Sequence, residues 1–220
     1  MNEWELMNAR HSVRAYKNTA IEEEKVRRLQ KEIEQCNRES GLRIQLFTEE
    51  PEAFQAGKAH YGAFRGCKNY FAIVGEKGKE EAVGYYGERL ALLSQSLGLN
   101  TCWVALTYKK GKVAVNVEKD ETLYVVIALG YGETEGVPHR SKPVEKVADV
   151  PKNAPTWYMN GVRAALTAPT AINQQQFWIT LTEDGKVKAV SKWGPCSKID
   201  LGIVKLHFEW GAGKENFEWA

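Results

Sequence analysis

Residues 168–178 read APTAINQQQFW, and the interpretation of the whole sequence depends on them. They follow a predicted helix and precede a predicted strand, and Pro169 ends the helix because proline lacks the N–H that continues it. A polar connection would explain this proline. It would not explain why Thr170 and Asn173, two short hydrogen-bonding side chains, precede glutamines and aromatic residues. We call residues 169–176 the polar loop and treat it as a candidate site.

A cluster of cationic and hydroxyl side chains lies near the start of the chain, in residues 10–16, RHSVRAY. Arg10 and Arg14 flank His11 and Ser12 ahead of the first long predicted helix, where a packed core requires none of them. One interpretation is a solvated turn, and the other is one side of an anion-binding site. We call this stretch the first basic segment.

Two more cations stand in HRSKP, residues 139–143, which we call the second basic segment. The residue before a proline is forced into an extended conformation. Alternate residues of an extended chain point the same way, so Arg140 and Lys142 can face one phosphate. Alone, such a stretch is more often a solvated loop. Together with the first basic segment, however, it indicates that cations from both segments bind one anion.

Hydrophobic patterning predicts an α+β fold. A capping-box spacing between Thr19 and Glu22 predicts the start of the first long helix, and a second helix is predicted over residues 80–97. The apolar runs at residues 70–75 and 122–130 are typical of buried strands, and the second should be central. Helices and strands therefore alternate in a mixed arrangement.

A proline-rich connection precedes a second, smaller set of elements. Thr156 is predicted to cap a helix that leads into the polar loop. Asp184 and Gly185 predict the turn of a β-hairpin, and residues 199–210 predict a last helix with one apolar face.

Composition narrows the possible functions. The 220 residues carry a net charge of +2, too small for general attraction to nucleic acid or an anionic membrane. The 4 cysteines and 4 histidines lack the spacing of a metal site, so no metal is expected. No apolar run is long enough for a bilayer and no signal peptide is recognisable, so a cytoplasmic protein without nucleic-acid or membrane partners is expected.

Together the motifs resemble the family of nitroreductases that depend on flavin mononucleotide (FMN). The first basic segment has the pattern RxSxRxY and the polar loop has AP(S/T)xxNxQ. Residues 84–103, GYYGERLALLSQSLGLNTCW, are similar to the long central helix of the family. LYVVIALGYGE resembles a late strand, and HRSKPVEKV resembles a phosphate-binding tail. These pieces cover nearly the whole chain.

The order of the motifs departs from the usual family, in which the polar loop follows the first helix. Members of the family are intertwined homodimers with the flavin at the interface. The resemblance therefore implies a fused pseudo-dimer, as in a branch from thermophilic bacteria: residues 1–150 carry the basic phosphate site, and the shorter half, residues 151–220, supplies the facing loop. The sequence of residues 199–213, IDLGIVKLHFEWGAG, would then be a shortened repeat, or sequence echo, of residues 83–100, VGYYGERLALLSQSLGLN. A monomer packed as one unit, with a mainly antiparallel sheet flanked by helices and a single flavin site, is expected.

By the same resemblance, the cofactor is FMN, the electron donor is NAD(P)H, and a nitroaromatic or quinone accepts electrons in a ping-pong cycle. Arg14 is the implied catalytic residue, a fixed cation that stabilises the reduced flavin. The implied cofactor-binding residues are Arg10, His11, Ser12, Arg14, Arg65, Val104, Ala105, Arg140, Lys142, Pro169, Thr170 and Asn173.

Two other functions remain open at this point. A flavin-binding protein that does not turn over would keep the same pocket. A module whose basic turn docks a phosphorylated or acidic partner would keep the cations without needing a flavin.

Overall fold

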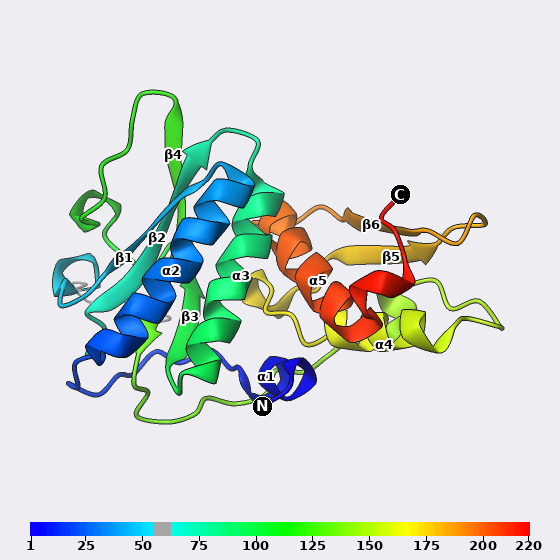
Figure 1. The fold of residues 1–220 in the computed structure, drawn as a ribbon, viewed down its shortest axis with the longest axis horizontal. Helices are drawn as coiled ribbons and strands as arrows, with labels where there is room; N and C mark the ends of the chain where they lie inside the picture. Colours follow the sequence, from blue (N-terminus) through cyan, green and yellow to red (C-terminus); the bar gives the residue numbers. More distant parts are fainter. Residues whose placement is uncertain (55–62) are drawn as a thin grey trace. The chain divides into compact units, whose positions relative to one another are not determined.

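The computed structural model describes residues 1–54 and 63–220 (Figure 1). Its helices and strands, in chain order, are α1 (Glu3–Ala9), α2 (Glu23–Ser40), β1 (Arg43–Phe47), β2 (Asn69–Glu76), α3 (Glu80–Ser96), β3 (Asn100–Val104), β4 (Glu121–Gly130), α4 (Thr156–Ala165), β5 (Phe177–Leu181), β6 (Val187–Ser191) and α5 (Ser197–Ala212). The alternation of helices with antiparallel strands confirms the predicted α+β class.

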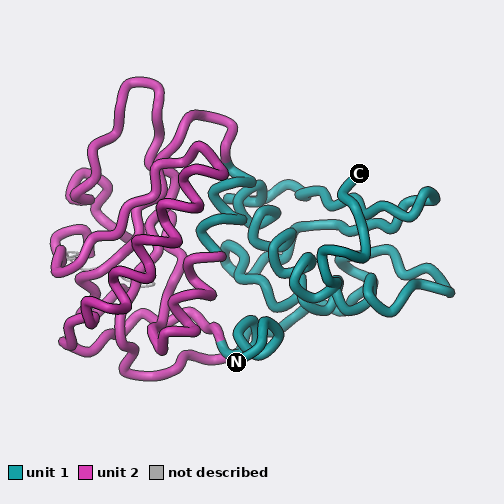
Figure 2. The backbone as a smooth tube through the Cα atoms, viewed as in Figure 1, with its two compact units in different colours: residues 1–9, 80–88, 138–220 teal, residues 10–79, 89–137 magenta. Residues whose placement is uncertain are grey.

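These elements form two compact units, coloured separately in Figure 2. Unit 1 consists of Met1–Ala9, Glu80–Glu88 and Pro138–Ala220, and unit 2 consists of Arg10–Lys79 and Arg89–Val137. The helix α3 contributes its first part to unit 1 and its second part to unit 2. The predicted halves of a fused pseudo-dimer remain a prediction.

The sheet of unit 2 has the strand order β1-β2-β4-β3, and every neighbouring pair is antiparallel. β4 lies between β2 and β3, as its apolar run predicts. In β2 every residue from Asn69 to Gly75 is buried, which explains why its sequence does not alternate between apolar and polar side chains. β3 lies at an edge, and this edge receives the first basic segment.

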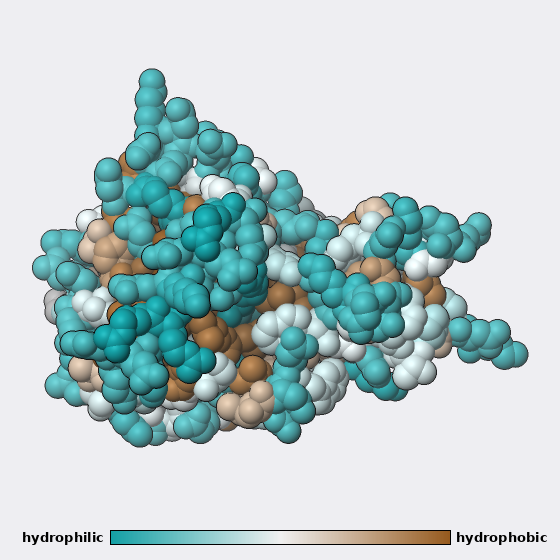
Figure 3. All heavy atoms as spheres, viewed as in Figure 1, coloured by the Kyte–Doolittle hydropathy of each residue, from teal (hydrophilic) through white to brown (hydrophobic). Residues whose placement is uncertain are grey.

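The helix α2 shows where local rules succeed and where they fail. Its buried residues include Leu29, Ile33 and Cys36 at the predicted spacing, and hydrophilic side chains cover its visible face (Figure 3). The capping-box prediction at Thr19 is wrong, because Glu22 occupies the cap position with no capping hydrogen bond from its side chain. The short helix α1, which precedes the first basic segment, was not predicted.

Unit 1 contains α4, α5 and the predicted hairpin of β5 and β6. Thr156 is the first residue of α4 and not its cap, since Pro155 holds that position. The aromatic rings of Tyr158 and Phe208 meet between α4 and α5 at 6.0 Å. A methyl group at Gly161 would lie 2.6 Å from the Phe208 ring, so the absence of a side chain there allows the two helices to approach.

Within unit 1, α5 crosses the first part of α3 in a reciprocal way. A methyl group at Gly84 would lie 1.9 Å from the carbonyl oxygen of Ile199 and 3.0 Å from the nitrogen of Ile203. A methyl group at Gly202 would lie 1.9 Å from the carbonyl oxygen of Glu81 and 2.7 Å from the nitrogen of the residue after Gly84. Each glycine thus meets the residue three before and the residue one after the other glycine. This is the contact pattern of a two-fold axis.

No helix within residues 1–54 and 63–220 is both long and apolar enough to cross a membrane.

Candidate functional site

The first basic segment lies along the free edge of β3 in unit 2. Its backbone forms parallel bridges from Ser12 to Thr101 and from Ala15 to Arg65. The N–H of Val13 donates to Thr101 O at 3.1 Å, and the N–H of Arg65 donates to the carbonyl oxygen of residue 14 at 2.9 Å. The extended backbone is therefore held by backbone partners, which leaves the side chains for other contacts.

The side chains of this segment separate into two groups. Val13 and Tyr16 are buried, at 2% and 3% exposure, whereas Ser12 and Arg14 are exposed. Arg10 is also buried, at 3%, so its guanidinium is inside the protein and not on the surface, as a solvated turn would have placed it. His11 is half-buried. Ser12 and Arg14 are thus the members of the segment that face solvent.

A cavity of about 440 Å³ opens beside this segment within unit 2. Its lining consists of Ser12, Val13, Arg14, Ala15, Ala63, Phe64, Arg65 and Thr134. Arg65 is paired with Glu133, which neutralises part of its charge. Arg14 has no ion-pair partner among the residues that the structure describes. The cavity therefore carries one uncompensated guanidinium next to a hydroxyl group, a donor set that suits an anionic oxygen.

The positive charge of Arg14 extends to two buried neighbours in unit 2. Burial raises the pKa of the Tyr16 hydroxyl well above its ordinary value, and the charge of Arg14 acts against that rise. Burial likewise raises the pKa of the Cys102 thiol, with Arg14 again opposing it. Both groups remain neutral at neutral pH, so neither removes the positive potential of the cavity.

Val104 and Ala105 stand at the end of β3. Val104 is buried at 3%, and Ala105, the next residue, is exposed. In the described part of the chain, neither lines the cavity beside the first basic segment. Their expected role at the flavin remains a prediction.

The polar loop in unit 1 has an unusual backbone. Ile172, Asn173 and Gln175 have φ values of 48°, 55° and 44°, which lie in the left-handed region that residues other than glycine rarely adopt. Ile172 is β-branched, for which this conformation is especially unfavourable, and it is 81% exposed. Such a backbone persists only where its surroundings enforce it.

Side chains of the loop itself supply much of that enforcement. Gln175 is 2% exposed, and its Nε2 donates to Asn173 Oδ1 at 2.9 Å. Its backbone N–H donates to Thr170 Oγ1 at 3.0 Å. Two of the predicted cofactor-binding side chains, Thr170 and Asn173, are therefore partners within the loop.

The second basic segment joins the polar loop. Asn173 Nδ2 and Gln175 Nε2 both donate to the carbonyl oxygen of Arg140, each at 2.9 Å. The ammonium group of Lys142 donates to Gln174 O at 2.6 Å and to Gln175 O at 3.2 Å. The structure thus brings Arg140 and Lys142 together with Thr170 and Asn173 in unit 1, and Pro169 adjoins them in the chain.

Sequence reasoning missed two residues that organise this loop. Gln175 was only one of three consecutive glutamines, and Asp200 was one residue of the last predicted helix. Asp200 is 4% exposed between two apolar neighbours, Ile199 and Leu201. An acidic residue in the apolar face of a helix was the available signal, because a buried carboxylate requires hydrogen-bond donors.

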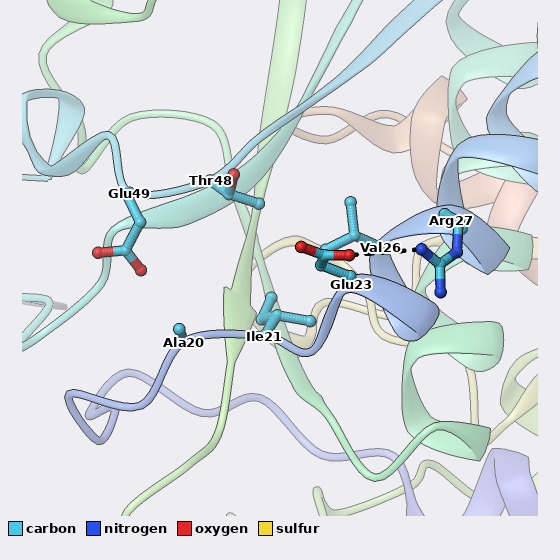
Figure 4. A pocket seen from close by; sticks show the side chains of 7 residues that line it. All are labelled: Ala20, Ile21, Glu23, Val26, Arg27, Thr48 and Glu49. Carbon is cyan, nitrogen blue, oxygen red and sulfur yellow. Dashed lines mark hydrogen bonds and ion pairs between the residues drawn. The ribbon is translucent and has the colours of Figure 1, made fainter.

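A second cavity, of about 350 Å³, lies in unit 2 where α2 begins (Figure 4). It is lined by Ala20, Ile21, Glu23, Val26, Arg27, Thr48 and Glu49. Glu23 and Arg27 pair across one helical turn at 3.4 Å, so the arginine there is already neutralised. None of the predicted site residues lines this cavity within the described ranges.

Within residues 1–54 and 63–220, no three His, Cys, Asp or Glu side chains gather closely enough to hold a metal ion. His60 lies outside the described residues.

An antiparallel sheet with flanking helices and a cationic cavity beside it are the features to compare with known proteins. The sequence matches the family described as "Putative TM nitroreductase" over residues 2–212. The chain is therefore a member of this nitroreductase family, as the motifs indicated.

Solved structures share the fold at low sequence identity. A "putative nitroreductase" from Thermotoga maritima is 23% identical with a TM-score of 0.66, over 99% of this chain and 87% of its own. A "putative nitroreductase in complex with FMN" from Desulfovibrio desulfuricans is 19% identical with a TM-score of 0.55, over 69% and 98%. A nitroreductase family protein from Streptococcus pneumoniae is 12% identical with a TM-score of 0.53, over 67% and 98%. No curated protein matches the sequence. The predicted nitroreductase-like fold is confirmed.

Proposed function

We propose that this protein is an FMN-binding oxidoreductase that takes electrons from NAD(P)H and passes them to a nitroaromatic, quinone or similar small acceptor. The observation that carries the proposal is the cavity beside the first basic segment, where Arg14 is uncompensated in a chain of the nitroreductase family. The FMN named for the Desulfovibrio protein supports the choice of cofactor. NADH and NADPH are equal candidates for the donor.

The residues beside the cavity fit a flavin mononucleotide chemically. Ser12 and Arg14 offer a hydroxyl and a guanidinium to anionic or carbonyl oxygens, and both are exposed while their backbone is fixed. FMN, when bound, supplies a ring that accepts and returns a hydride. In this proposal Ser12 and Arg10 of unit 2 hold phosphate oxygens, and Arg14 orients the pyrimidine edge. Arg140 and Lys142 of unit 1 remain proposed phosphate-binding residues.

The chemical contribution of this chain is then electrostatic. Arg14 places a positive charge where negative charge develops, and its extended backbone holds the charge without reorganisation. Arg65 adds a weaker charge because Glu133 accepts from it. The buried Tyr16 and Cys102 border this region as neutral groups, so they do not counter Arg14. In unit 1, Thr170 and Asn173 of the polar loop remain proposed flavin-binding residues.

We further propose that the chain is a fused pseudo-dimer with one flavin site, acting as a cytoplasmic monomer. Support comes from the reciprocal contact of Gly84 and Gly202, which lie in the two stretches, VGYYG of α3 and IDLG of α5, where the sequence echo begins. A two-fold axis relates identical surfaces in homodimers, and here it relates two segments of one chain. Sedimentation should give a monomer, and an obligate dimer would contradict this part of the proposal.

The deciding experiment reconstitutes the purified protein with FMN and measures its absorbance before and after NADH or NADPH is added. Retained yellow colour that bleaches with a nicotinamide and returns with an acceptor supports the proposal. Retained colour that never bleaches indicates a flavin-binding protein without turnover. Failure to bind FMN leaves the interaction module as the surviving alternative.

A pair of variants localises the effect. Arg14→Ala should weaken FMN binding about tenfold or more, because a charge-assisted hydrogen bond contributes about 1.5–3 kcal/mol. Lys17→Ala is the matched control, an exposed cation three residues further along whose backbone N–H bonds Tyr131 O. Equal FMN affinity in both variants would reject the assignment of Arg14.

A further inference from the structure

A buried carboxylate fastens the polar loop to α5. Asp200 lies in the first turn of α5. Its two oxygens accept from the backbone N–H of Ala171 at 3.0 and 3.2 Å, and Oδ2 also accepts from Gln174 Nε2 at 2.7 Å. In the described part of the chain Asp200 forms no ion pair. The groups that satisfy its negative charge therefore belong to the polar loop.

These bonds bracket the most strained part of the backbone. Ala171 and Gln174 stand immediately before and after Ile172 and Asn173, the two consecutive residues in the left-handed conformation. Each such residue costs about 1–3 kcal/mol, which the surroundings must offset. The side chain of Gln174 is itself fixed, because its Nε2 also donates to the carbonyl oxygen of Pro195 at 2.6 Å.

The loop has a second anchor, in the second basic segment. Lys142 and the carbonyl oxygen of Arg140 bind Gln174, Gln175 and Asn173. These bonds reach the loop from Asn173 onward, whereas the bond from Asp200 to Ala171 reaches the residue before the strained pair. Asp200 therefore fixes the entry of the strained turn, which the second basic segment does not contact through these bonds.

We propose that Asp200 is a positioning residue for the proposed flavin site: by binding Ala171 and Gln174 it holds Asn173 in the left-handed conformation that presents the polar loop to FMN. The inference rests on the proposed function, because FMN is the ligand of the loop only there. Asp200 acts through the loop and does not touch the cofactor.

The charge state of Asp200 gives this role a pH dependence. Burial raises the pKa of Asp200 to about 6, although the bonds from Gln174 and Ala171 lower it. Cys196, at the start of the same helix, is the titratable neighbour, and its thiol pKa is raised by burial and by Asp200. Within the described residues, no charged group of another element contributes to the shift of Asp200. The loop bonds lower the pKa, so they favour the carboxylate, whereas burial favours the protonated form. Protonation replaces an acceptor by a donor opposite the N–H groups, so while Asp200 stays buried in the folded protein its hold on the loop weakens as the pH falls through about 6.

The experiment compares Asp200→Asn with the wild type in two measurements. Hydrogen–deuterium exchange of the FMN-free protein at pH 7.5 should show faster exchange for the polar loop in the variant. FMN titration followed by flavin fluorescence should show a dissociation constant raised about tenfold at pH 7.5, since a hydrogen bond to a charged group is lost. Asp120→Asn, the same change at an exposed turn, should alter neither quantity.

The pH profile separates positioning from general structural support. The dissociation constant of the wild type should rise as the pH falls through about 6, and Asp200→Asn should lack this step. A step that persists in the variant overturns the inference. Unchanged exchange of the loop also overturns it, and so does faster exchange with unchanged FMN affinity.

Failure of the proposed function would look different. A wild type that binds no FMN, yet whose loop exchange depends on Asp200, refutes the flavin assignment and with it the positioning role, while leaving the anchor in place. If Asp200→Asn does not fold, the wild type alone decides. Its loop exchange, corrected for the intrinsic rate, should increase between pH 7.5 and pH 5 together with the FMN dissociation constant, and constant values overturn the proposal.

Discussion

The first basic segment and the polar loop are both rich in polar residues, but they are held by opposite means. The segment is extended and fixed by backbone bonds to Thr101 and Arg65, so its side chains are not needed to hold it. Arg14 extends from it with no ion-pair partner among the described residues, and the Ser12 hydroxyl contacts the Cys102 thiol. The loop is left-handed at several positions and is fixed by side chains, chiefly those of Gln175 and Asp200.

This difference explains what a polar motif can signify. Where the backbone holds itself, polar side chains are left for a ligand, as with Arg14. Where side chains hold the backbone, most of them are already engaged, as with Lys142, whose ammonium donates to two loop carbonyls. The number of polar residues in a motif therefore overstates the number of ligand contacts when the motif is a strained loop.

The largest expected effect disrupts the region that is held by its backbone. Gly66 has φ 68°, and a methyl group there would lie 2.3 Å from the carbonyl oxygen of Tyr16. Gly66→Ala should lower the free energy of unfolding by at least about 3 kcal/mol in urea melts, because a backbone atom cannot rotate away. Gly98→Ala, with φ 74° and no atom within 4 Å, should cost only about 1 kcal/mol. Equal losses would show that the segment is not tightly packed on Gly66.

A somewhat smaller effect concerns the free energy of unfolding that is lost when Asp200, the anchor of the polar loop, is ionised in its buried position. Because the folded pKa of Asp200, about 6, exceeds its ordinary 3.8, the shift stabilises the fold fully below pH 4, and this stabilisation is lost as the pH rises through 6. The wild type should therefore lose stability relative to Asp200→Asn as the pH rises. Between pH 4 and pH 7.5 the difference in unfolding free energy, variant minus wild type, should increase by up to about 3 kcal/mol. Denaturant melts at several pH values test this, and a constant difference would contradict the shift.

The next prediction contrasts one side chain from each region. Gln175→Ala removes bonds to Lys142 N, Arg140 O and Asn173 Oδ1 from a buried position, and it should cost about 2 kcal/mol of stability. Arg14→Ala removes an exposed side chain and should change stability by less than about 0.5 kcal/mol. Thermal melts without FMN make the comparison. Similar losses in both variants would remove the distinction between the two regions.

The smallest effect goes in the stabilising direction. Ile172→Gly relieves a left-handed β-branched residue whose side chain is 81% exposed, and it should raise the unfolding free energy by about 1 kcal/mol. Leu106→Gly, at a side chain that is 90% exposed outside the left-handed region, should lower it slightly. A destabilised Ile172→Gly would mean that the isoleucine makes contacts that offset its backbone strain.

The sequence predicted the elements that depend on local periodicity and missed those that depend on distant partners. Continuous apolar runs predicted β2 and β4. The predicted last helix, residues 199–210, begins and ends within two residues of α5. The anchoring of the polar loop was not predictable, because Asp200 acts on Ala171 from 29 residues away. The contact between Arg140 and Asn173 likewise joins positions 33 residues apart, which no local pattern reports.

The helices that cross at Gly84 and Gly202, α3 and α5, have different sequences, so each can change without the other. In a homodimer, a substitution on the two-fold axis appears twice and must suit its own image. Here Lys205 meets Glu81 at 2.5 Å, and His207 meets Glu88 at 3.0 Å, so opposite charges and unlike groups face each other across the crossing. Because α3 and α5 have different sequences, a substitution in one helix changes one side of the crossing only.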